Sequence, residues 1–173
     1  IQENLRSYRL KVRWIRPENI HLTLKFLGNI ERAVVQSIAG TISESVKGCG
    51  PISISAKGIG VFPSLKRPRV LWAGLAGATD ALGQLHRNLE GNMERIGFPK
   101  ENRHFKGHLT LGRFRGKADP KQLLDAMEAF EGFQTEPFVI DHLILFKSEL
   151  FPAGPTYSKV IQVIFNQNSR RLP

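Results

Sequence analysis

The tetrapeptide His-Leu-Thr-Leu occurs twice in this chain, at residues 21–24 and again at residues 108–111. Each copy alternates polar and apolar residues, which is typical of a β-strand with one buried face. The two leucines then share one side of the strand, while the histidine and the threonine lie next to each other on the other side. A fold that contains both copies therefore needs an apolar layer against the leucine side of each strand.

Helices and further strands are expected around these two segments. Apolar residues recur at helical spacing in four stretches, and strand-like apolar runs fill most of the remainder. Asp119 and Pro120 add an N-cap and a first-turn proline to the last helix. The predicted helices cover residues 1–8, 31–47, 79–96 and 118–130. The predicted strands cover residues 11–15, 20–28, 51–62, 69–75, 107–114, 133–140, 141–150 and 156–165.

The order of these elements indicates an α+β fold. Hairpin-like pairs of strands argue against a doubly wound parallel sheet and favour antiparallel sheets with helices packed on their outer faces. We expect a bilobal molecule in which two lobes are related by a pseudo-twofold axis, and each lobe contributes one His-Leu-Thr-Leu strand to a central cleft. No composition break separates the halves, so residues 1–173 are predicted to form a single bilobal domain.

The charge of the chain favours a polyanionic partner. Lysine and arginine total 25 against 15 aspartate and glutamate residues, which gives a formal net charge of +10 and attracts phosphate groups over long range. The single cysteine, Cys49, excludes an internal disulfide and suits a reducing compartment, so a cytoplasmic location is expected. No apolar run approaches the roughly 18 residues of a membrane-spanning helix, and no membrane partner is expected.

The doubled motif predicts an acid–base site. His21 with Thr23, and His108 with Thr110, would bring two imidazoles and two hydroxyls to one place. One imidazole can take a proton near neutral pH while the other gives one, and the hydroxyls can donate hydrogen bonds to a phosphate between them. A single His-x-Thr is usually structural, but two copies beside basic residues favour catalysis of phosphoryl transfer without a metal.

A metal site is the alternative use of paired histidines. It would need a third ligand, and these strands offer threonine where a carboxylate or a thiolate would be required. His104 is close to the second copy, but its spacing is not that of a ligand pair. His86 and His142 are interpreted as ordinary surface or boundary residues.

The residues around both copies resemble the two-histidine (2H) phosphoesterases. The stretches RPENIHLTLKFLG and FKGHLTLGRF are similar to the paired His-x-Thr-x motifs of that family. The stretches VFPSLKRPRVLWAGL and LILFKSELFPAGPTYSKV resemble its bacterial and archaeal 2′-5′ RNA ligase-like branch, the RNA 2′,3′-cyclic phosphodiesterases. The resemblance implies a bilobal α+β fold, no metal or other cofactor, and hydrolysis of a terminal 2′,3′-cyclic phosphate to a 2′-phosphate. It implies RNA with such an end as the partner, tRNA fragments among the candidates, and no obligate protein partner.

By the same resemblance, His108 is the general base that activates water and His21 is the acid that protonates the departing 3′-oxygen. Thr23 and Thr110 hold the phosphate, and Arg113 adds positive charge. Strict strand alternation would place Arg113 on the face opposite His108, so its role requires a bulge or a strand end. The family usually opens with an additional strand, which is absent here, so we expect a truncated sequence or a first lobe without an edge strand.

Two other functions are compatible with these residues. The same acid–base pair could join RNA ends through a 2′-5′ linkage, because one site serves both directions of a reversible step. A non-catalytic RNA-binding module is the other alternative. In that case Phe62, Trp72 and Phe105, which lie near basic residues, would stack on bases, although core packing is the simpler role for such aromatic side chains.

Overall fold

The computed structural model describes residues 1–151 and 154–165, and within it the chain divides into two compact units. The first unit comprises Ile1–Thr23, Ile54–Gly77 and Lys106–Phe138. The second unit comprises Leu24–Ser53, Ala78–Phe105 and the described residues from Val139 onward. The chain therefore passes between the units several times, and one of these passages immediately follows the first His-x-Thr motif.

The first unit holds most of a five-stranded sheet in the order β1-β4-β3-β2-β5. Its described pairings β1–β4, β4–β3 and β3–β2 are antiparallel. A bulge interrupts β2 between Lys57 and Ile59, at Gly58, whose positive φ of 59° suits glycine. The strands are β1 (Val12–Trp14), β2 (Ile52–Phe62), β3 (Val70–Gly77), β4 (Leu109–Phe114) and β5 (Phe138–Ile140).

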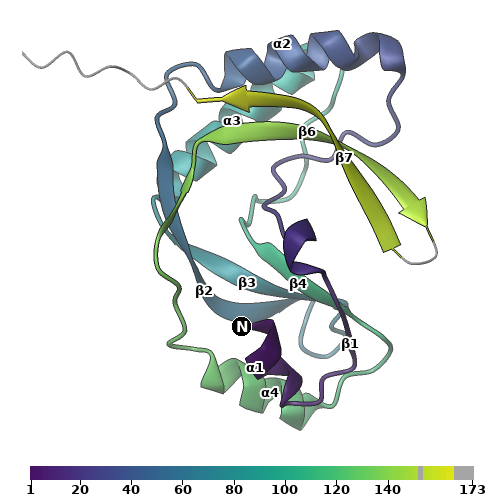
Figure 1. Cartoon of the computed structure of the whole chain (residues 1–173), viewed down its shortest axis with the longest axis vertical. Helices are drawn as coiled ribbons and strands as arrows, with labels where there is room; N and C mark the ends of the chain where they lie inside the picture. The colour runs from purple at the N-terminus through teal and green to yellow at the C-terminus, as the bar shows by residue number, and fades with distance from the viewer. Residues whose placement is uncertain (152–153, 166–173) are drawn as a thin grey trace, which may run out of the picture. The chain divides into compact units, whose positions relative to one another are not determined.

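Two helices, α1 (Gln2–Arg6) and α4 (Pro120–Ala129), pack on one face of this sheet (Figure 1). Asp119 caps α4 as the sequence predicted, because its carboxylate accepts hydrogen bonds from the backbone N–H groups of residues 121 and 122. A short 3-10 helix, η1 (Pro17–Asn19), follows β1. The core between helices and sheet contains Leu5, Leu10, Ala56, Leu71, Ala73, Leu111, Leu123, Ala126 and Phe130.

The second unit packs two helices on a two-stranded antiparallel sheet (Figure 1). The strands are β6 (His142–Phe151) and β7 (Gly154–Ile164); the helices are α2 (Val35–Ser45), which follows the 3-10 helix η2 (Arg32–Val34), and α3 (Thr79–Arg95). Gly97, with a φ of 94°, follows the end of α3 in the left-handed conformation that favours glycine. The buried centre of this layer consists of Ile38, Ile42, Leu89 and Met93. None of the helices in the described ranges is long and apolar enough to cross a membrane.

The α+β class with antiparallel sheets and helices on their faces is thus confirmed, and two local expectations are wrong. Residues 20–28 do not form a strand: only Leu22 makes a bridge, to Leu109. The alternation also fails as a guide to burial, because Phe26 is 77% exposed while the Lys25 side chain is 4% exposed. The physical reason is that the chain leaves the first unit after Thr23, where pairing stops, and Lys25 binds a buried carboxylate.

The second correction concerns the placement of the motifs. We expected one copy in each lobe, but both His-x-Thr stretches belong to the first unit. The bridge between Leu22 and Leu109 explains this, because it attaches the first copy directly to the strand that carries the second. The two copies are therefore neighbours, joined by one bridge at the edge of β4.

A buried polar cluster lies in the second unit, on α3. Glu90 is 5% exposed and accepts hydrogen bonds from Lys25 Nζ at 2.6 Å and from the backbone N–H of Glu101 at 2.7 Å. Burial by itself raises the pKa of the Glu90 carboxyl, but these hydrogen bonds and the charge of Lys25 outweigh it and lower the pKa below 4.5. Glu90 is therefore held in its charged form.

His86 is buried, where the sequence predicted a surface or boundary position. The residue is 9% exposed and its ring stacks on Phe105, with ring centroids 4.1 Å apart. Burial lowers the pKa of His86 below 6.5, and the opposing charges of Glu90 and Glu101 do not cancel that effect. At neutral pH the folded chain therefore favours the neutral form of this imidazole.

The lowered pKa values of His86 and Glu90 predict that acid destabilises the protein. Below pH 6.5 the unfolded chain protonates His86 more readily than the folded chain, so its contribution is full above that pH and falls below it. The contribution of Glu90 is full above pH 4.5 and is lost as the pH falls through its lowered folded value. We expect the Tm to fall between pH 7.5 and 5.5, and to fall less in His86→Phe, measured by calorimetry. His104→Phe, at an exposed position, is the control and should keep the wild-type slope; an unchanged slope in His86→Phe would contradict the assignment.

Candidate functional site

The first His-x-Thr motif lies beside β4 of the five-stranded sheet, next to the second motif. Leu22 and Leu109 form an antiparallel bridge, so the register places His21 opposite Thr110 and Thr23 opposite His108. Leu109 packs on the core side of the sheet. Because neighbouring residues of an extended chain point to opposite faces, all four polar side chains lie on the face away from α1 and α4. The structure thus brings together the four residues that the sequence predicted as a group.

Both imidazoles are oriented by the same local hydrogen bond. His21 Nδ1 lies 2.8 Å from the carbonyl oxygen of Asn19, and His108 Nδ1 lies 2.7 Å from that of Lys106. In each case the partner is two residues upstream. A carbonyl oxygen only accepts, so Nδ1 donates in both rings and Nε2 is the nitrogen at which each neutral ring takes up a proton. The two motifs therefore present equivalent chemistry.

His108 lies against an aromatic cluster from β2 and β3. Its ring centroid is 5.0 Å from that of Phe62, edge to face, and 6.2 Å from that of Trp72. The Lys106 ammonium lies 4.4 Å from the centroid of Trp72. Gly60 allows this packing, because a Cβ atom there would lie 2.2 Å from Trp72 Cζ2. The cluster limits the orientations of His108 and adds a cation to this face.

The aromatic residues considered for base stacking mainly pack within the protein. Trp72 is 9% exposed and contacts Phe62 at 5.1 Å between ring centroids. Phe105 stacks on His86 in the second unit. The packing interpretation therefore holds for Trp72 and Phe105.

A bulge in β4 changes the face on which Arg113 lies. Trp72 pairs with Thr110 while its neighbour Leu71 pairs with Gly112, so Leu111 is an extra residue in β4. Arg113 consequently pairs with Val70, which shares the face of Trp72. Arg113 therefore lies on the same face as Thr110. The sequence required a bulge for this placement, and the structure contains it.

Gln2 holds this bulge, and sequence reasoning missed it. The carbonyl oxygen of Leu111 accepts from the backbone N–H of Ile15 at 3.0 Å and from Gln2 Nε2 at 2.9 Å. Gln2 Nε2 also donates to the carbonyl oxygen of Ile15 at 2.7 Å. One side-chain amide thus satisfies two carbonyls of adjacent strands. No sequence signal marked Gln2, because a glutamine in a first helical turn is usually solvated.

We expect Gln2→Ala to lower the free energy of unfolding by about 1–3 kcal/mol, because it leaves a part-buried carbonyl without its donor. Gln2→Glu should cost more, since a carboxylate only accepts and would face two carbonyl oxygens. Urea denaturation measures both. Glu3→Ala, at an exposed position in the same helix, is the matched control and should change stability by less than about 0.5 kcal/mol. Equal effects at positions 2 and 3 would show that the amide does not hold the bulge.

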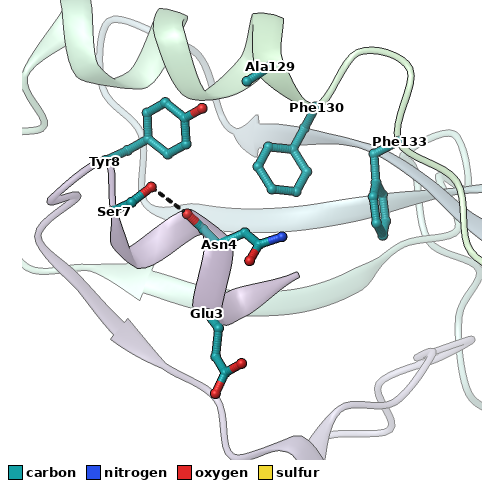
Figure 2. A pocket seen from close by; sticks show the side chains of 7 residues that line it. All are labelled: Glu3, Asn4, Ser7, Tyr8, Ala129, Phe130 and Phe133. Atoms are coloured by element: carbon teal, nitrogen blue, oxygen red, sulfur yellow. Dashed lines mark hydrogen bonds between the residues drawn. The ribbon is translucent and has the colours of Figure 1, made fainter.

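A pocket of about 560 Å³ lies elsewhere in the first unit (Figure 2). It is on the helix side of the sheet, where Phe130 belongs to the core and Tyr8 packs against it. The motif residues occupy the other face, so the pocket is separate from the candidate site. Its lining consists of Glu3, Asn4, Ser7, Tyr8, Ala129, Phe130 and Phe133. Among the described residues, no three histidine, cysteine, aspartate or glutamate side chains gather as a metal site.

Sequence comparisons identify relatives over most of the chain. The family model described as LigT like Phosphoesterase matches residues 1–72 and 75–157. A protein of Methanothermobacter thermautotrophicus named RNA 2′,3′-cyclic phosphodiesterase is 32% identical over 158 residues, which cover 91% of this chain and 85% of the relative. A protein of Aquifex aeolicus with the same name is 32% identical, and the match covers 86% of this chain and 79% of the relative.

Solved structures share the fold. The protein TT0787 of Thermus thermophilus aligns with a TM-score of 0.77 at 24% identity, covering 95% of this chain and 87% of that chain. The LigT of E. coli, solved as a complex with 3′-AMP, aligns with a TM-score of 0.71 at 21% identity. The alignment covers 96% of this chain and 91% of that chain. Together the comparisons confirm the resemblance inferred from the paired motifs.

Proposed function

This chain belongs to the LigT-like phosphoesterase family, and we propose that it hydrolyses a terminal 2′,3′-cyclic phosphate of RNA to a 2′-phosphate, with two histidines and without a bound metal. The observation that carries this proposal is the bridge between Leu22 and Leu109. It supports the proposal because it sets two His-x-Thr motifs beside each other, with both imidazoles oriented through Nδ1 by a backbone carbonyl. The names of relatives at 32% identity support the substrate.

In the proposed reaction, His108 Nε2 takes a proton from water as the water oxygen attacks phosphorus. The bond from phosphorus to the 3′-oxygen breaks, and protonated His21 gives its Nε2 proton to that oxygen. The products are a 2′-phosphate and a 3′-hydroxyl, with His108 protonated and His21 neutral. Exchange with solvent restores both rings. The base and acid assignments follow the family resemblance.

The remaining polar groups on this face would stabilise the transition state. The hydroxyls of Thr23 and Thr110 donate hydrogen bonds to the non-bridging phosphate oxygens. The guanidinium of Arg113, which the β4 bulge places on their face, offsets the negative charge that develops on them. In-line attack also needs the acid and the base on opposite sides of phosphorus, and in this proposal the two motifs supply one each.

A product assay tests this function. An oligoribonucleotide ending in a 2′,3′-cyclic phosphate is incubated with the purified chain in EDTA, and the product is separated against authentic 2′-phosphate and 3′-phosphate standards. We expect the 2′-phosphate, at a rate that EDTA does not change. A 3′-phosphate product, or no product with or without divalent metal, would contradict the proposed reaction. Turnover that EDTA abolishes and added metal restores would contradict metal independence.

A further inference from the structure

We propose that Arg13 binds an internal phosphate of the RNA strand that leads away from the reacting end, and that Arg113, which lies between Thr110 and Arg13, contacts both this phosphate and the terminal one. This inference rests on the proposed function, because it names how the same substrate is held beyond its terminal phosphate. Its occupant is a phosphodiester of single-stranded RNA.

The first argument is the register of β1 on β4. Arg13 is the direct antiparallel partner of Arg113, between the pairs Val12–Phe114 and Trp14–Gly112. Val12, Trp14 and Phe114 pack against the core on the helix side. Arg13 and Arg113 must therefore lie on the opposite face, which is the face of the motif residues. The pairing continues with a 2.7 Å hydrogen bond from the Arg115 N–H to the Lys11 carbonyl oxygen, so two more cations border the pair.

The second argument is electrostatic. Like charges directly opposite each other on adjacent strands destabilise a sheet. Arg13 and Arg113 are both exposed, and the ion pairs found within residues 1–151 and 154–165 include no arginine. A phosphate between the two guanidinium groups would relieve their repulsion, since each planar group can donate two parallel hydrogen bonds to phosphate oxygens. Charge complementarity thus selects an anionic ligand.

The third argument is position. His108 directly precedes β4, Thr110 and Arg113 follow along it, and Arg13 is opposite Arg113 on the adjacent strand β1. Because Leu111 is bulged, Thr110 and Arg113 lie opposite Trp72 and Val70, which are two residues apart on β3. At about 3.3 Å per residue, Arg113 therefore lies roughly 7 Å from Thr110 along the strand. Arg13 is more distant again, on a strand at the edge of the sheet. Beyond a terminal phosphate held between Thr23 and Thr110 there is thus a second cationic position. It can bind the next phosphate of an RNA strand, which a single nucleotide does not have.

The test compares a short and a long substrate. The value of kcat/KM is measured for a mononucleoside 2′,3′-cyclic phosphate and for an eight-nucleotide RNA with the same terminal nucleoside and the same cyclic end. Arg13→Ala should lower the value for the oligomer by roughly tenfold, the loss of a charged hydrogen bond, and should change the value for the mononucleoside by less than about twofold. Lys121→Ala, exposed on α4 at the other face, is the control and should affect neither. Equal losses on both substrates would place Arg13 at the terminal phosphate and overturn the inference.

A binding measurement separates this inference from the proposed function. Fluorescence anisotropy with the same oligomer ending in a 2′-phosphate requires no turnover. We expect Arg13→Ala to bind it about tenfold more weakly at low salt, and to reduce the slope of log K against log salt by roughly 0.7. Thermal unfolding of the variant checks that it is folded. An unchanged affinity and slope in Arg13→Ala would overturn the inference. If the wild-type protein does not hydrolyse the cyclic phosphate but Arg13→Ala still binds the oligomer more weakly, only the proposed reaction is contradicted.

Discussion

His21→Ala and His108→Ala are each expected to lower kcat for hydrolysis of an RNA 2′,3′-cyclic phosphate by about 10²–10⁴, the usual contribution of a positioned general acid or base. Each variant removes one of the two imidazoles that Nδ1 hydrogen bonds orient on the same sheet face. Single-turnover measurements with excess enzyme isolate the chemical step. The double variant should lose less than the product of the two single effects, because the two groups act in one step.

The control for these variants is His104→Ala. His104 is exposed and lies four residues before His108, but it is outside both motifs, so its removal should leave kcat within about twofold. Circular dichroism and Tm verify that every variant is folded. If folded His21→Ala and His108→Ala retained wild-type rates, the acid–base assignment would be wrong.

Lys25→Met is expected to lower the free energy of unfolding by about 3–5 kcal/mol, because it leaves the Glu90 carboxylate buried without its cation. The two side chains are 4% and 7% exposed, and Lys25 Nζ also donates to the carbonyl oxygen of Pro99 at 2.8 Å. Such a loss is a large part of the roughly 5–15 kcal/mol that stabilises a domain. Urea denaturation measures the effect.

Two comparisons make this prediction specific. The double variant Lys25→Met with Glu90→Leu should recover most of the loss, since an apolar pair replaces two buried charges. Lys100→Ala breaks an ion pair to Glu94 whose side chains are each 53% exposed, and should change stability by less than about 1 kcal/mol. A loss for Lys25→Met as small as that of Lys100→Ala would contradict the buried pairing.

The helices and most strands could be predicted because their patterns repeat locally. Leu82, Leu85, Leu89 and Met93 recur at helical spacing and are all buried on α3. The strand predicted over residues 20–28 does not form, for a physical reason. Alternation describes which way side chains point in an extended chain, but a strand also needs a partner, and only Leu22 has one. The burial of Lys25 could not be predicted from the sequence either, because its partner Glu90 lies far away in the sequence.

The sequence by itself determined which residues we propose as the acid–base and phosphate-binding groups. Wherever the repeated His-Leu-Thr-Leu segment is extended, its alternation places each histidine on the same face as its threonine. Only the tertiary structure decided that the two copies pair directly, that both imidazoles are protonated at Nδ1, and that Arg113 shares their face. These features depend on contacts such as that from Gln2 to the bulged Leu111, two residues far apart in the first unit's sequence. Local periodicity carries no information about such contacts, because their energies depend on distances that arise only when the chain is folded.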